Sequence, residues 1–402
     1  MSPALFNLYM ADMPEPDKEK GQGLVVYADD VNMTSTHEKV KIAERNAQIY
    51  LNKIVDWIKE NKLLLADKTQ VTLFTPDPAE YNKNLNIKLE GQRIKTTKNP
   101  KILGLTFDPK LTFSEHIKNV ENASKGNLRL IKALSGTTWG QQQETLTNTY
   151  KQYNRPAIEY ACTSWSPIIS KTNEDKLQRI QNAALRCATG HTKDTNVIHL
   201  HTETKVLPLN QHMKMIASQF REGTRDPAHP LNQAANAPSP ERRQKMTALH
   251  KDSVTMVHGC HREGEEIKNI ERNKRKLHTI FVEEHLESIP ENTLIGMRPP
   301  EVRKEERTLP RGTRRTLAQL RAQKCPMLKS YLHDIGANDT PNCPLCERTE
   351  HTCAHLFSCP SVPTELAPID LWCQPVRAAE LINDWDRRLA AEEEAQGAAV
   401  RQ

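Results

Sequence analysis

Apolar and polar positions follow two different periods in the first 110 residues of the chain. The apolar run 24–27 and the alternating segment 31–34 have the pattern of two short strands, and they flank an Ala-Asp-Asp triplet at 28–30, which predicts a tight β-hairpin with two acidic residues at its tip. Apolar residues then recur at helical spacing from Val40 to Ile58, as in a helix with one apolar face. Further short strands are predicted at 70–74, 87–89, 92–94 and 102–107. An α+β fold is therefore expected here.

From Thr112 onward the pattern is mainly helical. Helices are predicted at 114–134, 141–153, 155–164 and 173–189, with Gly190 as a C-terminal stop. Residues 221–243 are rich in Pro, Ala, Asn and charge and have no periodicity, which is typical of a linker. A further helix is predicted from Thr313 to Tyr331, with its apolar residues on one side. The chain is thus expected to contain several folded parts.

The positive charge of the chain is concentrated near its C-terminal end. Residues 303–324 contain eight Lys or Arg against Glu305 and Glu306, an excess of +6 that equals the formal net charge of the whole chain. Clustered cations suit a phosphate backbone, because neutralised phosphates release condensed counterions. A solvated helix face is the alternative interpretation.

Four cysteines between 343 and 359 indicate a metal site rather than a disulfide framework. Cys343, Cys346, His355 and Cys359 form the pattern CxxC-x8-HxxxC, whose thiolate and imidazole ligands suit tetrahedral zinc. From spacing alone, His351 and Cys353 are near enough to compete as ligands, and buried free cysteines remain an alternative.

The Asp29-Asp30 pair is the other candidate site. Adjacent carboxylates repel each other, and a bound divalent cation relieves this repulsion; Mg²⁺ held by such a pair can assist nucleotidyl transfer. A polar turn without chemistry is the alternative, since Asp is common in hairpin loops.

Ordered motifs extend this picture. Residues 2–12 and 26–30 resemble the end of motif B and the whole of motif C of non-LTR retrotransposon reverse transcriptases, while 63–69 and 101–108 resemble motif D and the primer-grip strand. Residues 135–140 and 155–160 are similar to the thumb of Jockey-like (LINE) elements. Their C-terminal tail is similar to three further segments, 309–321, 343–346 and 352–360.

The resemblance implies roles for individual residues. Asp29 would be a Mg²⁺ ligand, Asp30 its neighbour near the primer end, and Lys68 a proton donor to pyrophosphate. His355 would be the zinc histidine, so that Cys353 and Cys373 are spare thiols. Nucleic-acid contacts are expected from Tyr27, Gly104, Arg311, Arg314, Arg315 and Arg321, and base stacking from Phe357 or Trp372.

The expected architecture is a partial polymerase palm with an antiparallel sheet and helices, followed by a helical thumb and a small zinc module. The expected boundaries are 1–110 for the palm, 111–220 for the thumb, 221–250 for a linker, 251–335 for a charged helical region, 336–375 for the CCHC zinc module and 376–402 for a C-terminal helix and tail.

The implied function is RNA-directed DNA polymerisation on an RNA template with a DNA primer or target, using Mg²⁺ in the palm and Zn²⁺ in the tail. The chain opens within motif B, so the aspartate of motif A and the fingers are expected to be missing, and the chain alone is expected not to polymerise. A non-catalytic nucleic-acid-binding remnant that uses the thumb, basic helix and zinc knuckle is the alternative function. A purely structural zinc protein is a third.

The location of the protein follows from what its sequence lacks. It shows no secretory signal and no run of ~18 apolar residues that could span a bilayer. A soluble, intracellular protein of the nucleus or cytoplasm is expected, without membrane contact, and the oligomeric state stays open.

Overall fold

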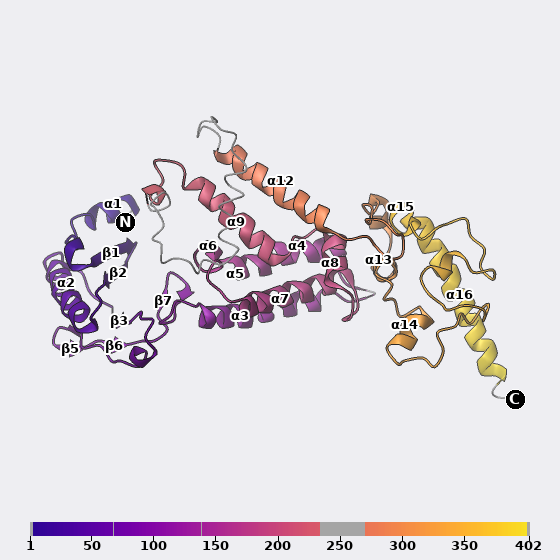
Figure 1. Ribbon diagram of the computed structural model, residues 1–402, viewed down its shortest axis with the longest axis horizontal. Coiled ribbons are helices and arrows are strands. Elements are labelled where there is room, and N and C mark those ends of the chain that lie inside the picture. Colours follow the sequence, from indigo (N-terminus) through magenta and orange to yellow (C-terminus); the bar gives the residue numbers. More distant parts are fainter. Residues whose placement is uncertain (1–2, 67, 138, 234–269, 400–402) are drawn as a thin grey trace. The chain divides into compact units, whose positions relative to one another are not determined.

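The computed structural model describes residues 3–66, 68–137, 139–233 and 270–399, and it divides after His116 into two compact units (Figure 1). Small paired strands and helices form the first unit, whereas helices dominate the second. This mixture confirms the expected α+β class.

The first unit is built around a β-hairpin and one long helix. It begins with α1 (Pro3–Tyr9), η1 (Lys18–Lys20), β1 (Gln22–Tyr27), β2 (Asp30–Ser35) and α2 (Val40–Glu60). The apolar face of α2 buries Tyr50, Ile54 and Trp57 against side chains of both strands. Burial of such side chains, at about 25 cal/mol per Å² of apolar surface, is what holds the hairpin on the helix. The predicted hairpin and helix are both confirmed.

Short strand pairs complete the first unit. They are β3 (Gln70–Val71), β4 (Lys88–Leu89), β5 (Gln92–Arg93), β6 (Lys95–Thr96), β7 (Lys101–Ile102) and β8 (Leu105–Thr106), with η2 (Pro78–Glu80) between β3 and β4. The β3–β6 pair is parallel, and the other pairs are antiparallel. In the described residues the sheets are therefore two-stranded rather than one broad antiparallel sheet.

The strand predicted at 102–107 is wrong in one respect, because the chain reverses inside it. Leu103 and Gly104 have φ of 46° and 84°, and they form the turn between β7 and β8. Glycine adopts such a backbone without a steric penalty, so Gly104 ends a strand rather than packing within one.

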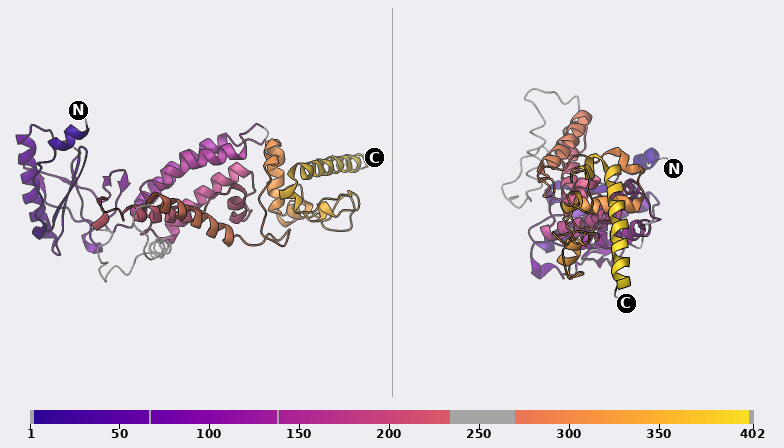
Figure 2. Two further views of the ribbon diagram at one scale, coloured as in Figure 1. Left: turned by 90° about the horizontal axis from the view of Figure 1, so that it is seen from above. Right: turned by 90° about the vertical axis from the view of Figure 1, so that its right-hand side faces the viewer.

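The second unit begins as a helical bundle. Its helices are α3 (Ser114–Ala133), α4 (Gln143–Thr149), the π-helix η3 (Tyr150–Asn154), α5 (Arg155–Glu159), α6 (Cys162–Trp165), α7 (Lys171–Thr189), α8 (Val197–Thr204), α9 (Leu209–Gly223) and α12 (Ile270–Ser288). Fully buried Ile131, Leu146, Leu185 and Leu200 join α3, α4, α7 and α8 in one core. Figures 1 and 2 show α12 lying along α9.

One prediction about this bundle changes and another is confirmed. The helix expected at 155–164 is broken where Ala161 adopts a φ of 49°, so that α5 and α6 are separate. Gly190 ends α7 in a left-handed conformation, as predicted. Residues 234–250 of the predicted linker and 251–269 of the predicted charged helical region lie outside the described residues. In the described parts of these two segments, α9 extends to Gly223 and α12 begins at Ile270.

The C-terminal part of the second unit has its own core. It contains η5 (Lys304–Thr308), α13 (Arg311–Arg321), α14 (Lys329–Asp334), η6 (His355–Phe357), α15 (Asp370–Cys373) and α16 (Pro375–Ala399). The single helix predicted from Thr313 to Tyr331 is wrong, because the chain leaves the helix after Arg321 and Gln323 adopts a φ of 55°. Its predicted apolar side is nonetheless buried, as Leu317, Leu320 and Leu328 show. Among the described residues, no helix is long and apolar enough to cross a bilayer.

Candidate metal centres and the basic helix

The acidic hairpin carries two consecutive aspartates at the end of a two-stranded ribbon. Because Tyr27 pairs with Asp30 in the β1–β2 register, the turn itself consists of Ala28 and Asp29. Ala28 has a φ of 51°, which lets the chain reverse in two residues. Asp29 and Tyr27 are exposed, and Asp30 is half-buried. The tip therefore presents carboxylate oxygens to solvent.

Lys68 lies next to this tip. Its Nζ is 3.8 Å from Oδ1 of Asp30, although 38 residues separate them in sequence. Both side chains are well exposed, so the ion pair contributes little to folding stability. The residue before it, Asp67, lies outside the described residues.

The hairpin offers two carboxylates as possible metal ligands rather than a group of three or more. Within the described ranges, the one group of three or more His, Cys, Asp or Glu side chains close enough to share a metal ion is at the other end of the chain. Hard oxygen ligands suit Mg²⁺, which keeps several waters when one or two carboxylates hold it. The donor atoms present at the hairpin fit such a partly hydrated ion.

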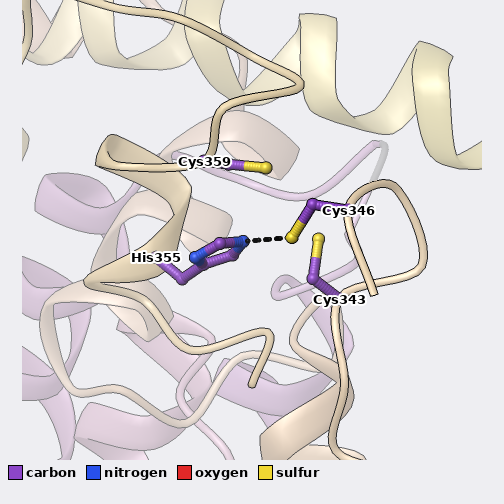
Figure 3. Close-up of side chains that lie close together, drawn as sticks. All are labelled: Cys343, Cys346, His355 and Cys359. Atoms are coloured by element: carbon purple, nitrogen blue, oxygen red, sulfur yellow. Dashed lines mark hydrogen bonds between the residues drawn. The ribbon is translucent and has the colours of Figure 1, made fainter. Parts of the chain in front are cut away.

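That other group is a Cys₃His cluster, drawn in Figure 3. Ligand atoms of Cys343, Cys346, His355 and Cys359 all lie within 4.8 Å of one another. Cys343 and Cys346 come from a turn closed by the Glu347 N–H, which donates to the Cys343 carbonyl at 2.8 Å. His355 begins η6, and Cys359 follows that helix. Soft sulfur and imidazole donors converging in this way can hold a tetrahedral metal ion.

Neighbouring groups orient and tune these ligands. The Thr349 hydroxyl lies 2.9 Å from Nδ1 of His355, so that Nε2 points to the Cys346 sulfur, 3.4 Å away. Such outer contacts fix which nitrogen faces a metal. The Arg348 backbone N–H lowers the pKa of the Cys346 thiol, while burial raises the pKa of Cys343 to about 11 and lowers that of His355.

The two competing residues lie elsewhere. His351 packs against the Trp385 ring with centroids 5.1 Å apart, and its Nδ1 accepts from the Lys329 N–H. Cys353 is 1% exposed and belongs to the apolar core, where burial raises the pKa of its thiol. Neither belongs to the converging group. Trp385 and Thr349, which support the cluster, escaped the sequence-based prediction because no ligand pattern marks them.

Helix α13 carries the arginines predicted to contact nucleic acid, and its contacts revise that prediction for two of them. Arg314 is 6% exposed and pairs with Glu144 at 2.7 Å. Arg321 is 2% exposed and donates to Glu306 at 2.6 Å and to Glu203 at 2.7 Å. Buried guanidinium groups with carboxylate partners have no charge left to offer to a phosphate.

The other two arginines have different partners. Arg311 donates to five backbone carbonyls, among them those of Gly136 and Cys187, and Arg315 donates to the Gly190 carbonyl and the Thr137 hydroxyl. The acceptors of both groups are neutral. The predicted stacking residues are buried, with Phe357 at 8% and Trp372 at 2% exposure, so neither presents a ring face to solvent.

Comparison with known proteins finds a matching family and several similar proteins. Residues 1–107 match the family described as reverse transcriptase (RNA-dependent DNA polymerase). The chain is 25% identical over 229 residues to the RNA-directed DNA polymerase from mobile element jockey of Drosophila melanogaster, a match covering 55% of this chain and 24% of that protein.

Two further relatives from the same organism agree. The probable RNA-directed DNA polymerase from transposon BS is 25% identical, in a match that covers 56% of this chain and 25% of that protein. The probable RNA-directed DNA polymerase from transposon X-element is 24% identical, in a match that covers 60% of this chain and 27% of that protein. The chain thus spans about a quarter of the length of these curated relatives. No solved structure matches it.

Proposed function

Because this chain belongs with the Jockey-like reverse transcriptases of non-LTR retrotransposons, we propose that it supplies part of the palm, the thumb and a zinc module of an RNA-directed DNA polymerase. The first unit corresponds in this proposal to the palm and the helical bundle to the thumb. Its template is RNA, and its primer or target is DNA.

One observation carries the catalytic part of the proposal. The hairpin presents Asp29 and Asp30 at its tip, and the separate Lys68 lies within 3.8 Å of Asp30. Lys68 and Asp30, which separate sequence motifs assign to one reaction, therefore lie close together, and Asp29 adjoins Asp30 in the turn. Such a coincidence is not expected of a hairpin whose acids merely form a polar turn.

The proposed roles follow from the chemistry of nucleotidyl transfer. The primer 3′-hydroxyl attacks the α-phosphorus of a nucleotide, and pyrophosphate leaves. When bound, Mg²⁺ lowers the pKa of the attacking hydroxyl and neutralises charge on the phosphates. Asp29 would hold that ion, and Asp30 would lie beside the primer end. The Lys68 ammonium, on an exposed and movable side chain, would donate a proton to the departing pyrophosphate.

A chimeric polymerase tests these roles. Residues 22–107 of this chain would replace the matching segment of the jockey polymerase, and extension of a DNA primer on an RNA template with Mg²⁺ would be measured. We expect extension that Asp29→Asn lowers at least about 100-fold, since each lost metal-binding charge weakens transition-state stabilisation by several kcal/mol. Asp56→Asn, on the exposed side of α2, is the matched control. Equal extension by the Asp29→Asn and Asp56→Asn chimeras would reject the catalytic role of the hairpin.

A second candidate function is nucleic-acid binding without catalysis. It is favoured by the carboxylate count, because the described residues bring only two acids together at the hairpin while two-metal chemistry needs a larger set. The isolated chain is accordingly expected to give no primer extension. It would still bind RNA, and raising the salt concentration would weaken that binding.

For the Cys₃His cluster we propose Zn²⁺. All four donors are of the types that zinc prefers, and no donor position is left open for a reacting water, which is typical of a structural site. In a region held by short helices and loops, such an ion supplies folding free energy directly.

A further inference from the structure

The connection between α3 and α4 presents an aromatic ring to solvent. The side chain of Trp139 is 70% exposed. The other four tryptophans of the chain are buried, with exposures of 7% for Trp57, 0% for Trp165, 2% for Trp372 and 0% for Trp385. An exposed indole offers a large flat apolar face together with a polar N–H, which is a combination that binding surfaces use.

Backbone contacts hold the residues around Trp139 in a closed loop, here called the Trp139 loop (residues 135–137 and 139–140). The Gly140 N–H donates to the Gly136 carbonyl at 2.9 Å, and the Gln141 N–H donates to the Leu134 carbonyl at 2.8 Å. A Cβ on Gly136 would lie 2.3 Å from Cε2 of Trp139, so the indole lies directly against glycine backbone. The ring is thus supported on the protein side.

Helix α13 fixes this loop from outside. Arg311 donates through Nε to the Gly136 carbonyl at 3.0 Å and through Nη2 to the Ser135 carbonyl at 3.3 Å, while Arg315 reaches the Thr137 hydroxyl at 2.9 Å. These contacts join residues more than 170 positions apart in sequence. The Trp139 loop is therefore held by two cations.

The charge around the loop is not neutralised by these contacts. Arg311 and Arg315 donate to backbone carbonyls and one hydroxyl, whereas Arg314 and Arg321 of the same helix pair with glutamates. Arg129 and Lys132 are exposed on the last turns of α3, which leads into the loop, and their i,i+3 spacing places them on one face. The residues that hold the loop and those that lead into it from α3 therefore carry net positive charge.

We propose that the Trp139 loop is a binding site for single-stranded nucleic acid, in which the indole stacks on one base while Lys132, Arg311 and Arg315 attract the neighbouring phosphates. A flat exposed ring beside cations matches a ligand that has a free π-face and a polyanionic backbone. A duplex keeps its bases stacked on each other and cannot offer that face. The choice of partner rests on the proposed function, whereas the site itself rests on exposure and charge.

The experiment uses tryptophan fluorescence, because Trp139 is the one tryptophan that solvent reaches. The full chain, prepared with Zn²⁺, is titrated with 15-nucleotide oligo(U) and oligo(dT) and with a duplex of equal length. Stacking should quench the exposed indole with either single strand. We expect Trp139→Ala to weaken binding, measured by anisotropy of a labelled strand, about 10-fold or more, as for the loss of one stacked base. Trp139→Phe should retain most of the affinity while losing the quenching.

Matched controls separate the stacked ring from a general surface effect. Tyr153→Ala removes another exposed aromatic of the second unit and should leave affinity unchanged. Arg315→Gln should reduce the slope of log affinity against log salt by about 1, whereas Lys171→Gln, whose lysine pairs with Glu174 at 3.2 Å, should not. Equal affinity of the wild type and Trp139→Ala, or equal quenching by the duplex, would overturn the proposal.

A further outcome is informative. A loss of self-association on Trp139→Ala without a change in strand affinity, seen by light scattering, would instead identify a protein contact and overturn the proposal. The chimera that tests the polymerase proposal carries residues 22–107 of this chain, so its result does not depend on Trp139. Failure of the polymerase proposal and failure of this one are therefore distinguishable.

Discussion

At the scale of single residues, the Cys₃His cluster is decided by which side chains converge. Cys343 and Cys353 are both almost fully buried and belong to the same apolar core, yet only the sulfur of Cys343 lies within 4.8 Å of the other ligand atoms. Burial alone therefore does not identify a ligand. Convergence of donor atoms does.

Paired substitutions test this distinction. Cys343→Ser should abolish stoichiometric Zn²⁺ binding, because a hydroxyl is a poor zinc ligand and the remaining three donors leave the ion open to water. Cys353→Ser should retain the metal and lose about 1–3 kcal/mol of stability through burial of a hydroxyl. Metal content after gel filtration measures both. Loss of zinc in Cys353→Ser alone would contradict the ligand assignment.

Buried histidines make a prediction about pH. Burial lowers the pKa of His201 to about 4, and its Nδ1–H donates to the Val206 carbonyl at 2.7 Å. His285 faces the ring edge-on, 6.1 Å away, and a positive charge on either ring would disfavour protonation of the other. The neutral form is therefore favoured in the folded state relative to the unfolded chain, where histidine titrates near 6.5.

Between these two values the unfolded chain binds more protons, so stability should fall as the pH drops from about 6.5 to about 4 and should not change further below that range on account of His201. The loss from this group is roughly 3 kcal/mol. His201→Asn keeps a donor that does not titrate, and it should flatten the pH profile of the urea midpoint. His278→Asn, an exposed control on α12, should not. An unchanged profile for His201→Asn would argue against this linkage.

At the scale of elements, α13 connects the helical bundle to the part that carries the Cys₃His cluster. Its arginines reach Glu144 on α4, Glu203 on α8 and Glu306 on η5. The basic stretch predicted as a nucleic-acid face thus has a mainly internal role at Arg314 and Arg321. Charged groups removed from water need such partners, because an unpaired buried charge is costly.

Arg321→Ala should destabilise the second unit strongly. The substitution would remove the guanidinium that donates hydrogen bonds to Glu203 and Glu306. The side chains of these two glutamates are only 7% and 3% exposed. Breaking a buried pair in this way costs about 3–5 kcal/mol. Arg387→Ala, at 78% side-chain exposure on α16, should change stability by less than about 0.5 kcal/mol. Chemical denaturation compares the stabilities of the two variants. Similar midpoints would contradict the stabilising role of the Arg321 ion pairs.

At the scale of the whole molecule, each unit has a core of its own. The hairpin core around Tyr50 and Trp57 belongs to the first unit, and the core around Leu317 and Trp385 belongs to the second. A perturbation in one unit should therefore leave the unfolding of the other unchanged.

Removal of the Zn²⁺ proposed for the Cys₃His cluster tests this independence. A chelator should lower the unfolding transition of the second unit, since structural zinc contributes binding free energy to folding, and should not move that of the first. Hydrogen exchange followed peptide by peptide distinguishes α16 from α2. Adding Zn²⁺ back should restore the protection of α16, and Mg²⁺, as the control ion, should not. Equal loss of protection in both helices would contradict the two-unit description.

Local patterns determined much of this protein from sequence alone. The Asp29 turn and the Cys343 to Cys359 spacing involve residues close in the chain, so short-range geometry was enough to predict the hairpin and the grouping of ligands. The helix from Val40 followed from its apolar period in the same way. The reversal at Gly104 was not predicted, because residues 102–107 have the pattern of one continuous strand. The turn is evident only from the positive φ angles of Leu103 and Gly104.

Tertiary structure alone decided which groups the arginines of α13 contact and which tryptophan is exposed to solvent. Arg311 meets the Gly136 carbonyl 175 positions away, and Arg321 meets Glu203 at a separation of 118. No periodicity encodes such pairings, since they depend on how whole helices pack. Trp139 and Trp372 look alike in sequence, yet one is 70% exposed and the other 2%. Burial is a property of the assembled core rather than of the residue, which is why only the folded chain separates them.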